Sequence, residues 1–247
     1  MNVVNGPAMS PDFSVVVPVF NEAGSAPDLA REIAEAFAGR AFEMLFVDDA
    51  STDSSRAQLA SLKTDLPMLR IIAHGRNAGQ SRAIRTGVLA ARAPIVITLD
   101  GDGQNDPADA PAVAARLMQG PASLGLVSGL RRNRRDSRAK LWASRISNGL
   151  RRRLLKDGAT DTGCGLKAFR REAYLRLPYF DHQHRFLPAL FAREGYEVAY
   201  EPVSHRARRF GASKYTNFGR LMVSIPDLLG VAWLINRTRL TGGVEEV

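Results

Sequence analysis

The residues best suited to chemistry lie in one acidic stretch, ITLDGDGQND, at positions 97–106. Asp100 and Asp102 follow an apolar run at 94–99 that is typical of a buried strand. Unpaired carboxylates cannot remain inside a packed sheet, so we expect them at the strand's carboxyl end, where open parallel α/β sheets bind ligands. Oxygen ligands of this kind suit Mg²⁺ or Mn²⁺, often together with substrate phosphates. For an isolated Asp-Gly-Asp, the alternative is a plain acidic turn.

Three other predicted strands also end in polar residues: PVFNE at 18–22, VDDASTD at 47–53 and HGRNAG at 74–79. Carboxyl ends of parallel strands meet at one edge of a sheet, so these tips should share a crevice with the two aspartates. Carboxylates at the first two tips suit the N–H and O–H donors of a base and a ribose. Ser51 or Asp53 could instead cap the following helix. The sequence has no Gly-x-Gly-x-x-Gly fingerprint and no P-loop, which argues against dinucleotide and P-loop chemistry.

The positive charge of the chain is concentrated in two blocks. The net charge is +9, and residues 131–153 alone contain ten Lys or Arg against one Asp. A second block at 204–220 has five Lys or Arg and no acid. Such clusters indicate an anionic partner, which could be a nucleic acid, a phosphorylated substrate or acidic lipid headgroups. The alternative is a solvated helix face.

Strand-like and helix-like runs alternate over the first 130 or so residues and predict an α/β fold, with a parallel sheet and right-handed crossovers. Asp106 is the expected N-cap of a helix that starts at Pro107, where proline is tolerated. The expected strands are 13–19, 42–47, 69–73, 94–99 and 124–127, and the expected helices are 26–37, 54–62, 80–91 and 107–118.

A length of 247 residues and a hydrophobic content of 45% indicate one domain with a C-terminal extension. We expect a flexible N-terminus at 1–12, an α/β domain at 13–215, an amphipathic helical segment at 216–240 and a tail at 241–247. Residues 1–12 have no Lys or Arg and do not predict a signal peptide. No run of about 18 apolar residues predicts a membrane-spanning helix. The single cysteine, Cys164, suits a reducing cytoplasm.

Six motifs, occurring in order, carry a family resemblance. PVFNE (18–22), VDDASTD (47–53), NAGQSRAIRTG (77–87) and LDGDGQ (99–104) resemble the family 2 glycosyltransferases, which have the GT-A fold. DTGCGLKAF (161–169) and HRARRFGASKY (205–215) are similar to the polyprenyl-phosphate branch, which includes dolichol-phosphate mannose synthase. The resemblance covers about residues 13–235. It implies a Rossmann-like, mostly parallel sheet flanked by helices, followed by a short amphipathic extension.

The resemblance also implies roles for particular residues. Asp102 would be the principal ligand of the metal, Mg²⁺ or Mn²⁺, and would bridge it to the diphosphate; Arg208 and Lys214 would close over the phosphates. Arg131 and Arg145 lie where the family places arginines near the acceptor phosphate. The implied nucleotide-binding residues are Pro18, Phe20, Asn21, Glu22, Asp49, Ser51 and Asp100; the implied metal ligands are Asp100, Asp102 and Gln104; and Gly211 and Ser213 shape the phosphate loop.

The implied activity is metal-dependent, inverting transfer of a sugar from a nucleoside-diphosphate sugar, GDP-mannose or a UDP-hexose, to undecaprenyl or dolichyl phosphate. A lipid phosphate is already ionised near neutral pH, because the second pKa of an alkyl phosphate is about 6, so it needs positive charge rather than a general base. The abundance of Arg agrees with such an acceptor. Asp161 and His184 are conceivable bases, although Asp161 suits an anchor for the Gly163–Gly165 loop better.

Three alternatives stay open at this point. They are a GT-A transferase that acts on a saccharide hydroxyl in cell-envelope polysaccharide synthesis, a sugar nucleotidyltransferase, and a basic nucleic-acid-binding domain. The last leaves the acidic crevice unexplained, so no nucleic acid is expected as partner.

Membrane access would rest on Leu221–Ile235 and the basic blocks, since many bacterial relatives carry two C-terminal transmembrane helices and this chain ends soon after Ile235. We therefore expect a cytoplasmic protein, peripherally bound to the anionic inner face of the cytoplasmic membrane. The alternative for Leu221–Ile235 is a helix packed on the domain or on a partner, for which an integral-membrane protein is a candidate.

Overall fold

The computed structural model describes residues 10–131, 154–155, 158, 161, 163–207 and 217–241, with the backbone alone for 217–224. Seven strands form one sheet in the order β3-β2-β1-β4-β6-β5-β7. Neighbours are parallel except that β6 runs antiparallel to both β4 and β5. The strands are β1 (Phe13–Val19), β2 (Phe42–Asp48), β3 (Leu69–Ala73), β4 (Ile95–Thr98), β5 (Leu124–Arg131), β6 (Lys167–Arg170) and β7 (Glu197–Val203).

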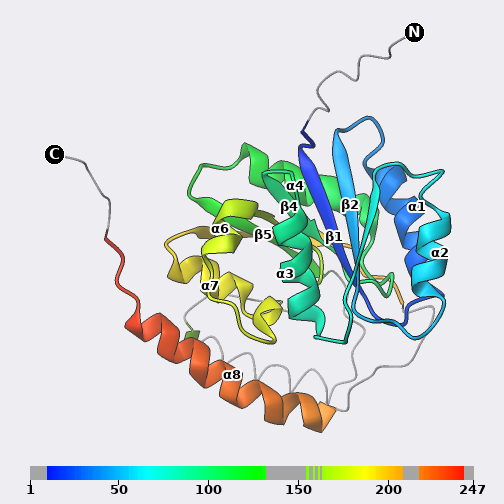
Figure 1. Cartoon of the computed structure of the whole chain (residues 1–247). Helices are drawn as coiled ribbons and strands as arrows, with labels where there is room; N and C mark the ends of the chain where they lie inside the picture. The colour runs from blue at the N-terminus through cyan, green and yellow to red at the C-terminus, as the bar shows by residue number, and fades with distance from the viewer. Residues whose placement is uncertain are drawn as a thin grey trace.

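Helices cover both faces of this sheet (Figure 1). The described helices are α1 (Ala26–Ala36), α2 (Ser55–Ser61), α3 (Gln80–Ala90), α4 (Ala110–Gln119), α6 (Arg171–Arg176), α7 (Leu187–Arg193) and α8 (Asn217–Arg237), with short 3-10 turns η1 (Pro107–Asp109) and η2 (Gln183–Arg185).

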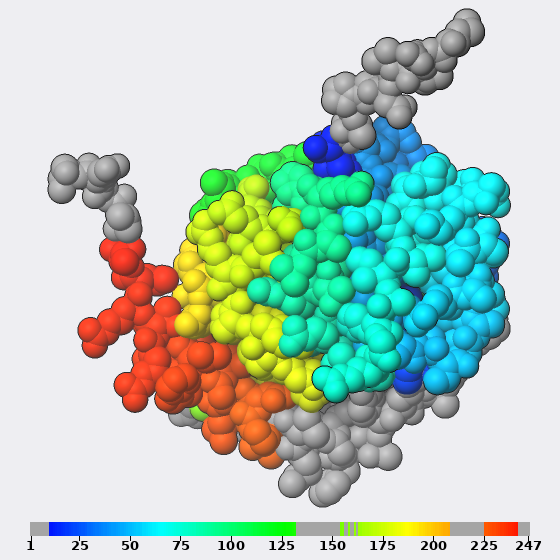
Figure 2. Space-filling view, in the orientation of Figure 1, coloured from blue at the N-terminus to red at the C-terminus, as the bar shows by residue number. Residues whose placement is uncertain are grey.

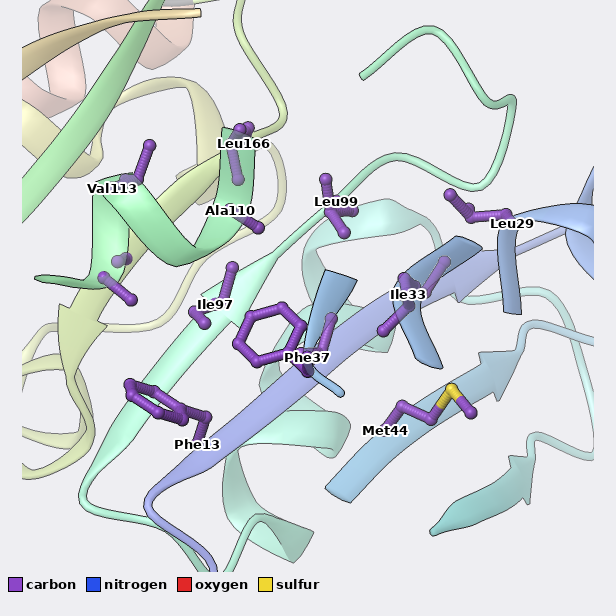
Figure 3. Close-up of a cluster of buried hydrophobic side chains, with 14 of the residues drawn as sticks. Phe13, Leu29, Ile33, Phe37, Met44, Ile97, Leu99, Ala110, Val113 and Leu166 are labelled. Carbon is purple, nitrogen blue, oxygen red and sulfur yellow. The ribbon is translucent and has the colours of Figure 1, made fainter. Parts of the chain in front are cut away.

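Alternation of side chains along β1 divides the core into two clusters. Val15 and Val17 face α1, α2 and α4, and Phe37 at the end of α1 packs against Phe13 with ring centroids 5.7 Å apart (Figure 3). Val16 faces the second cluster, which α3, α6 and α7 cover. Because both faces are buried, β1 reads as a nearly continuous apolar run.

Close packing of α3 on the sheet fixes where its first turn lies. A Cβ at position 87 would stand 2.4 Å from Cγ1 of Val16, so Gly87 is what lets α3 approach β1. The amino end of α3 consequently reaches the carboxyl end of β4.

The predicted elements of the first 130 residues are confirmed within a few residues, except that β5 extends to Arg131. Asp106 is confirmed as a cap, since its Oδ1 accepts the backbone N–H of Ala108 at 3.0 Å. The predicted helix from Pro107 begins as the turn η1 and continues as α4. The basic run 132–153 lies outside the described residues.

Helix α8 lies across the end of the domain at which the parallel strands finish (Figure 1). Val231 and Ala232 are buried against the second core cluster, and Nδ1 of His182 bonds Oδ2 of Asp227 at 2.9 Å. Ile225, Leu229 and Trp233 are 47%, 58% and 58% exposed. The segment therefore packs on the domain with one side and presents an apolar stripe on another. No helix in the described part of the chain is long and apolar enough to span a membrane.

Candidate active site

The tips of β1 and β2 are bound to each other by side chains that the sequence had suggested for nucleotide binding. The backbone N–H of Asn21 donates to Oγ of Ser51 at 2.9 Å, and Oδ1 of Asn21 accepts the N–H of Thr52 at 2.7 Å. Asn21 has a left-handed φ of 57°, a conformation that asparagine tolerates better than most residues. Asn21 and Ser51 thus fix the loops after β1 and β2 relative to each other.

Pro18, Phe20 and Glu22 lie on the same partly buried tip of β1. The N–H of Glu22 donates to Oγ of Ser55 at 2.9 Å, at the first residue of α2. Oδ1 of Asp53 accepts the backbone N–H of the same residue, Ser55, at 2.9 Å. The N-cap position of α2 is Ser54, whose side chain makes no cap bond, so neither of the two suggested residues occupies it.

Asp49 organises the turn between β3 and α3. It is 3% exposed, and its carboxylate accepts bonds from Nδ1 of His74 at 2.7 Å and from the backbone N–H groups of Ala78 and Gly79 at 2.9 and 2.8 Å. Oδ1 of Asp49 already accepts two hydrogen bonds, from His74 and Ala78, and Oδ2 accepts one from Gly79. Because Ala78 and Gly79 directly precede α3, these bonds fix the position of its first turn. Any contact with a nucleotide base would use the remaining capacity of Oδ2.

Asp100 lies just beyond the end of β4, against a glycine. Its Oδ1 accepts a hydrogen bond from Nε2 of Gln80 at 2.8 Å, and its N–H donates to Oδ1 of Asn105 at 3.2 Å. A Cβ on Gly165 would lie 2.2 Å from Oδ2 of Asp100, so only glycine leaves room for the carboxylate. Burial and the neighbouring Asp102 carboxylate raise the pKa of Asp100 to about 6.

Asp102 and Gln104 form the acidic turn itself. Oδ1 of Asp102 accepts the N–H of Gln104 at 3.1 Å, while the backbone O of Gln104 accepts the N–H of Arg206 at 2.9 Å. The Arg206 guanidinium pairs with Asp106 at 2.7 Å and also with Glu32 on α1. Arg206 therefore ties the segment after β7 to the acidic turn, two residues before Arg208. From the sequence, Arg206 was predicted only as part of the second basic block. Its position in the same motif as Arg208 could have indicated a role in the site.

The donor set of the acidic turn fits a divalent cation. Asp100, Asp102 and Gln104 offer carboxylate and amide oxygens, the ligands that Mg²⁺ and Mn²⁺ prefer. Burial, and then the charge of Asp102, raise the pKa of Asp100, and a bound cation would stabilise both carboxylates in their ionised form. Within the described residues no three His, Cys, Asp or Glu side chains cluster as a complete metal site. Such a cation would take its other ligands from water or substrate phosphates.

A cavity of about 320 Å³ opens beside Asp100. Its walls are the first turn of α3, the end of β4, the Gly163–Gly165 turn, Lys167 and η2. Lys167 is buried, its Nζ donates to the backbone O of Cys164, and burial lowers its pKa. Burial, together with Arg185 and Lys167, holds the pKa of His184 well below its usual range. Lys167 and Gln80 were not predicted as site residues, although both lie inside the motifs DTGCGLKAF and NAGQSRAIRTG.

Arg131 and Asp161 form a two-bond ion pair beside this cavity. Nε and Nη2 of Arg131 lie 2.7 and 2.8 Å from the two carboxylate oxygens of Asp161. Oδ1 of Asp161 also accepts the N–H of Gly163 at 3.2 Å, so Asp161 anchors the glycine turn as expected. The bidentate face of Arg131 is directed at Asp161, which leaves its suggested contact with the acceptor phosphate to the remaining N–H groups of the guanidinium.

The remaining suggested site residues lie outside the described part of the chain. They are the acceptor-phosphate candidate Arg145 and the phosphate-loop residues Arg208, Gly211, Ser213 and Lys214.

Comparison with known proteins identifies the class to which this fold and site belong. The family model described as glycosyl transferase family 2 matches residues 14–177. The chain belongs to this family.

Among curated relatives, the chain is 38% identical over 223 residues to an undecaprenyl-phosphate 4-deoxy-4-formamido-L-arabinose transferase of Salmonella paratyphi B. The match covers 87% of this chain and 66% of the relative, so the chain spans just under two thirds of that protein's length.

Two solved structures share the fold. Glucosyl-3-phosphoglycerate synthase from Mycobacterium tuberculosis, in complex with Mg²⁺ and UDP, superposes with a TM-score of 0.71 at 19% identity, covering 94% of this chain and 82% of that one. The mannosyltransferase PcManGT from Pyrobaculum calidifontis, in complex with GDP-Man and Mn²⁺, has a TM-score of 0.62 at 22% identity, covering 91% and 70%. The GT-A fold expected from the sequence is confirmed.

Proposed function

We propose that this glycosyltransferase moves a sugar from a nucleoside-diphosphate sugar to a polyprenyl phosphate such as undecaprenyl phosphate. The observation that carries the proposal is the acidic turn at the carboxyl end of β4, where Asp100 borders a polar cavity. Support for this acceptor class comes from the Salmonella relative, which is named for transfer to undecaprenyl phosphate.

Catalysis would depend on neutralising charge on the departing diphosphate. Cleavage of the sugar–phosphate bond adds negative charge to a group that already carries it, so groups that stabilise this charge lower the barrier. Asp100, Asp102 and Gln104 would hold Mg²⁺ or Mn²⁺, which when bound supplies positive charge to the diphosphate. Arg208 and Lys214, which follow Arg206 in the sequence, would contribute further positive charge.

The state of the two conceivable bases favours a phosphate acceptor over a hydroxyl acceptor. The Asp161 carboxylate is engaged by Arg131 and Gly163, and Nδ1 of His184 is bonded to Ser81. A hydroxyl acceptor must lose a proton as it attacks, whereas a lipid phosphate attacks already ionised. The alternative, transfer to a saccharide hydroxyl, would require a general base, and both conceivable bases are already engaged in these contacts.

We also propose that the protein works at the cytoplasmic face of the membrane, attached peripherally. Ile225, Leu229 and Trp233 form an exposed apolar stripe on α8. Helix α8 lies at the end of the molecule where the parallel strands finish (Figures 1 and 2). Apolar burial of such a stripe and attraction of basic blocks to anionic lipids are the two weak signals that reversible attachment needs. An integral-membrane partner is the other occupant that this stripe suits.

For the sugar, the Salmonella relative suggests 4-deoxy-4-formamido-L-arabinose, and GDP-mannose and UDP-hexoses are the other candidates. The test is to incubate purified protein with undecaprenyl phosphate, Mg²⁺ or Mn²⁺, and each labelled nucleotide sugar in turn. We expect label in the organic phase with one donor, and none with the Asp102→Asn variant. Label on a free saccharide or protein hydroxyl, with none on the lipid, would show that the acceptor is wrong while the family assignment stands.

A further inference from the structure

The cavity beside Asp100 contains a histidine that is held from a distant part of the chain. Ser81 lies in the first turn of α3 and His184 lies in η2, 103 positions later. Oγ of Ser81 is 2.7 Å from Nδ1 of His184, and the backbone N–H of His184 donates to the same Oγ at 3.2 Å. Two contacts between the same two residues fix both the position of the imidazole and its rotation.

These contacts favour one position for the proton of the ring. A serine hydroxyl has one hydrogen to donate. Oγ already accepts the His184 backbone N–H, and no other acceptor for the Ser81 hydroxyl is recorded in the described part of the chain. Donation of this hydrogen to Nδ1 gives the hydroxyl an acceptor, whereas an Nδ1–H group would leave it without one among the described residues. The low pKa of His184 keeps the ring neutral, so its single proton is on Nε2.

Nε2 is consequently a hydrogen-bond donor at a wall of the cavity. His184 lines the cavity, and Nε2 has no partner among the residues that the structure describes. Lys167 adds N–H groups to the same walls, while Asp100 adds a carboxylate oxygen. Hydrogen-bond donors and an acceptor thus line the same cavity.

This combination matches a sugar better than a phosphate or a lipid chain. A phosphate that no cation bridges would meet the Asp100 carboxylate in the same cavity, and an acyl chain would leave the polar groups without partners. A sugar ring both donates and accepts hydrogen bonds through its substituents. The volume of about 320 Å³ is at the lower end of the usual range for ligand pockets, which suits a single ring.

We propose that His184, fixed by Ser81 as the Nε2–H tautomer, donates a hydrogen bond to an oxygen of the transferred sugar and selects donors that carry an acceptor there. The inference rests on the proposed function and adds a positioning residue to it. His184 is not the general base in this arrangement, because the nitrogen that could take a proton is bonded to the Ser81 hydroxyl.

The experiment compares how much the sugar adds to nucleotide binding in wild type and variants. Calorimetry would give the Kd of UDP and UDP-glucose, and of GDP and GDP-mannose, and the ratio within each pair isolates the sugar's contribution. We expect His184→Leu to reduce this ratio about tenfold, as loss of one hydrogen bond predicts, while the Kd of the bare nucleotide stays within about twofold. His184→Gln, whose amide can still donate, should restore most of the ratio.

His182→Asn is the matched control, because His182 bonds Asp227 on α8 and does not line the cavity. Asparagine also suits its left-handed φ of 61°. This variant should leave the ratio unchanged. Equal weakening of nucleotide and nucleotide-sugar binding in His184→Leu would overturn the proposal, because it would indicate a structural role alone.

A second measurement does not depend on the choice of donor. Nitrogen-15 spectra of the His184 ring should show protonated Nε2 and unprotonated Nδ1 at neutral pH, and Ser81→Ala should weaken this preference. Protonated Nδ1 in wild type would overturn the proposal. If no nucleotide or nucleotide sugar binds although the ring has the expected tautomer, the proposed function fails and this inference fails with it. If nucleotide sugars bind but His184→Leu does not change what the sugar adds to binding, only this inference fails.

Discussion

The substitution Gly165→Ala should separate activity from stability, because the three atoms nearest to the added methyl group all belong to the carboxyl group of Asp100. The new Cβ would stand 2.2, 2.3 and 2.6 Å from Oδ2, Cγ and Oδ1 of Asp100, whereas real Cβ contacts essentially never fall below 3.0 Å. Oδ2 must therefore move by about 0.8 Å or more. That displacement exceeds the tolerance of about 0.2 Å for metal–ligand distances.

Misplacement of a reacting group by about 1 Å can reduce the rate about 100-fold, which corresponds to about 2.7 kcal/mol of transition-state stabilisation. We expect a loss of this size in kcat/KM. The atoms that move are the end of a side chain at a cavity wall, and alanine restricts the unfolded chain more than glycine does. The free energy of unfolding should thus change by less than about 1 kcal/mol.

The assay is sugar transfer under saturating Mg²⁺ or Mn²⁺, with thermal unfolding measured on the same preparations. Gly75→Ala is the control, because a Cβ at position 75 has nothing within 4 Å. Activity of Gly165→Ala within threefold of wild type would refute the argument that Asp100 must occupy this position. A large fall in Tm would show that the glycine is needed for folding instead.

Three further results are expected. Asp102→Asn should abolish transfer with unchanged Tm, EDTA should reproduce the loss, and added Mg²⁺ or Mn²⁺ should reverse the EDTA effect; full activity in demetallated protein would contradict the metal assignment. Changing Leu229 and Trp233 together to Ser should weaken sedimentation with anionic vesicles about tenfold or more, and high salt should weaken it further; equal binding to neutral vesicles at every salt concentration would count against membrane docking. Although burial alone would raise the pKa of Glu43, hydrogen bonds from Ser14, Arg92 and Arg70 lower it below the usual 4.5. Its carboxylate therefore stabilises the fold above about pH 4.5 and loses that contribution as the pH falls further, so Glu43→Gln should reduce the free energy of unfolding by on the order of 1 kcal/mol at pH 7 and by less at pH 3 in urea titrations.

Local patterns in the sequence were sufficient for the first part of the fold. The apolar run of β1 and the apolar positions of α1 predict their elements because each pattern reflects burial of that segment. Asp106 could be predicted as a cap because a cap bonds a backbone group only two residues away. The polar residues after β1 to β4 could be predicted to lie at one edge of the sheet, because the carboxyl ends of these strands could be located in the sequence.

The partners of the site residues could not be predicted in the same way. Asp49 suggested a nucleotide contact, but its carboxylate is bonded by the side chain of His74, 25 residues later, and by the backbone N–H groups of Ala78 and Gly79, 29 and 30 residues later. His184 reaches Ser81 across 103 positions, and Arg206 reaches Glu32 across 174. Periodicity reports only whether a position is buried; which polar groups meet depends on the packing of elements that are distant in sequence.

The antiparallel strand β6 explains how the site acquires groups from the second half of the chain. A parallel strand brings its carboxyl end to the ligand edge of the sheet, whereas an antiparallel strand brings its amino end. The register of Thr98 with Lys167 places the first residue of β6 beside the last residue of β4. The Gly163–Gly165 turn, which precedes β6, is thereby held next to Asp100, and Oγ1 of Thr98 donates to the backbone O of Gly165 at 2.8 Å. The antiparallel strand β6 thus brings Lys167 and Gly165 next to the acidic turn. A parallel strand in its place would have brought both residues to the opposite edge of the sheet.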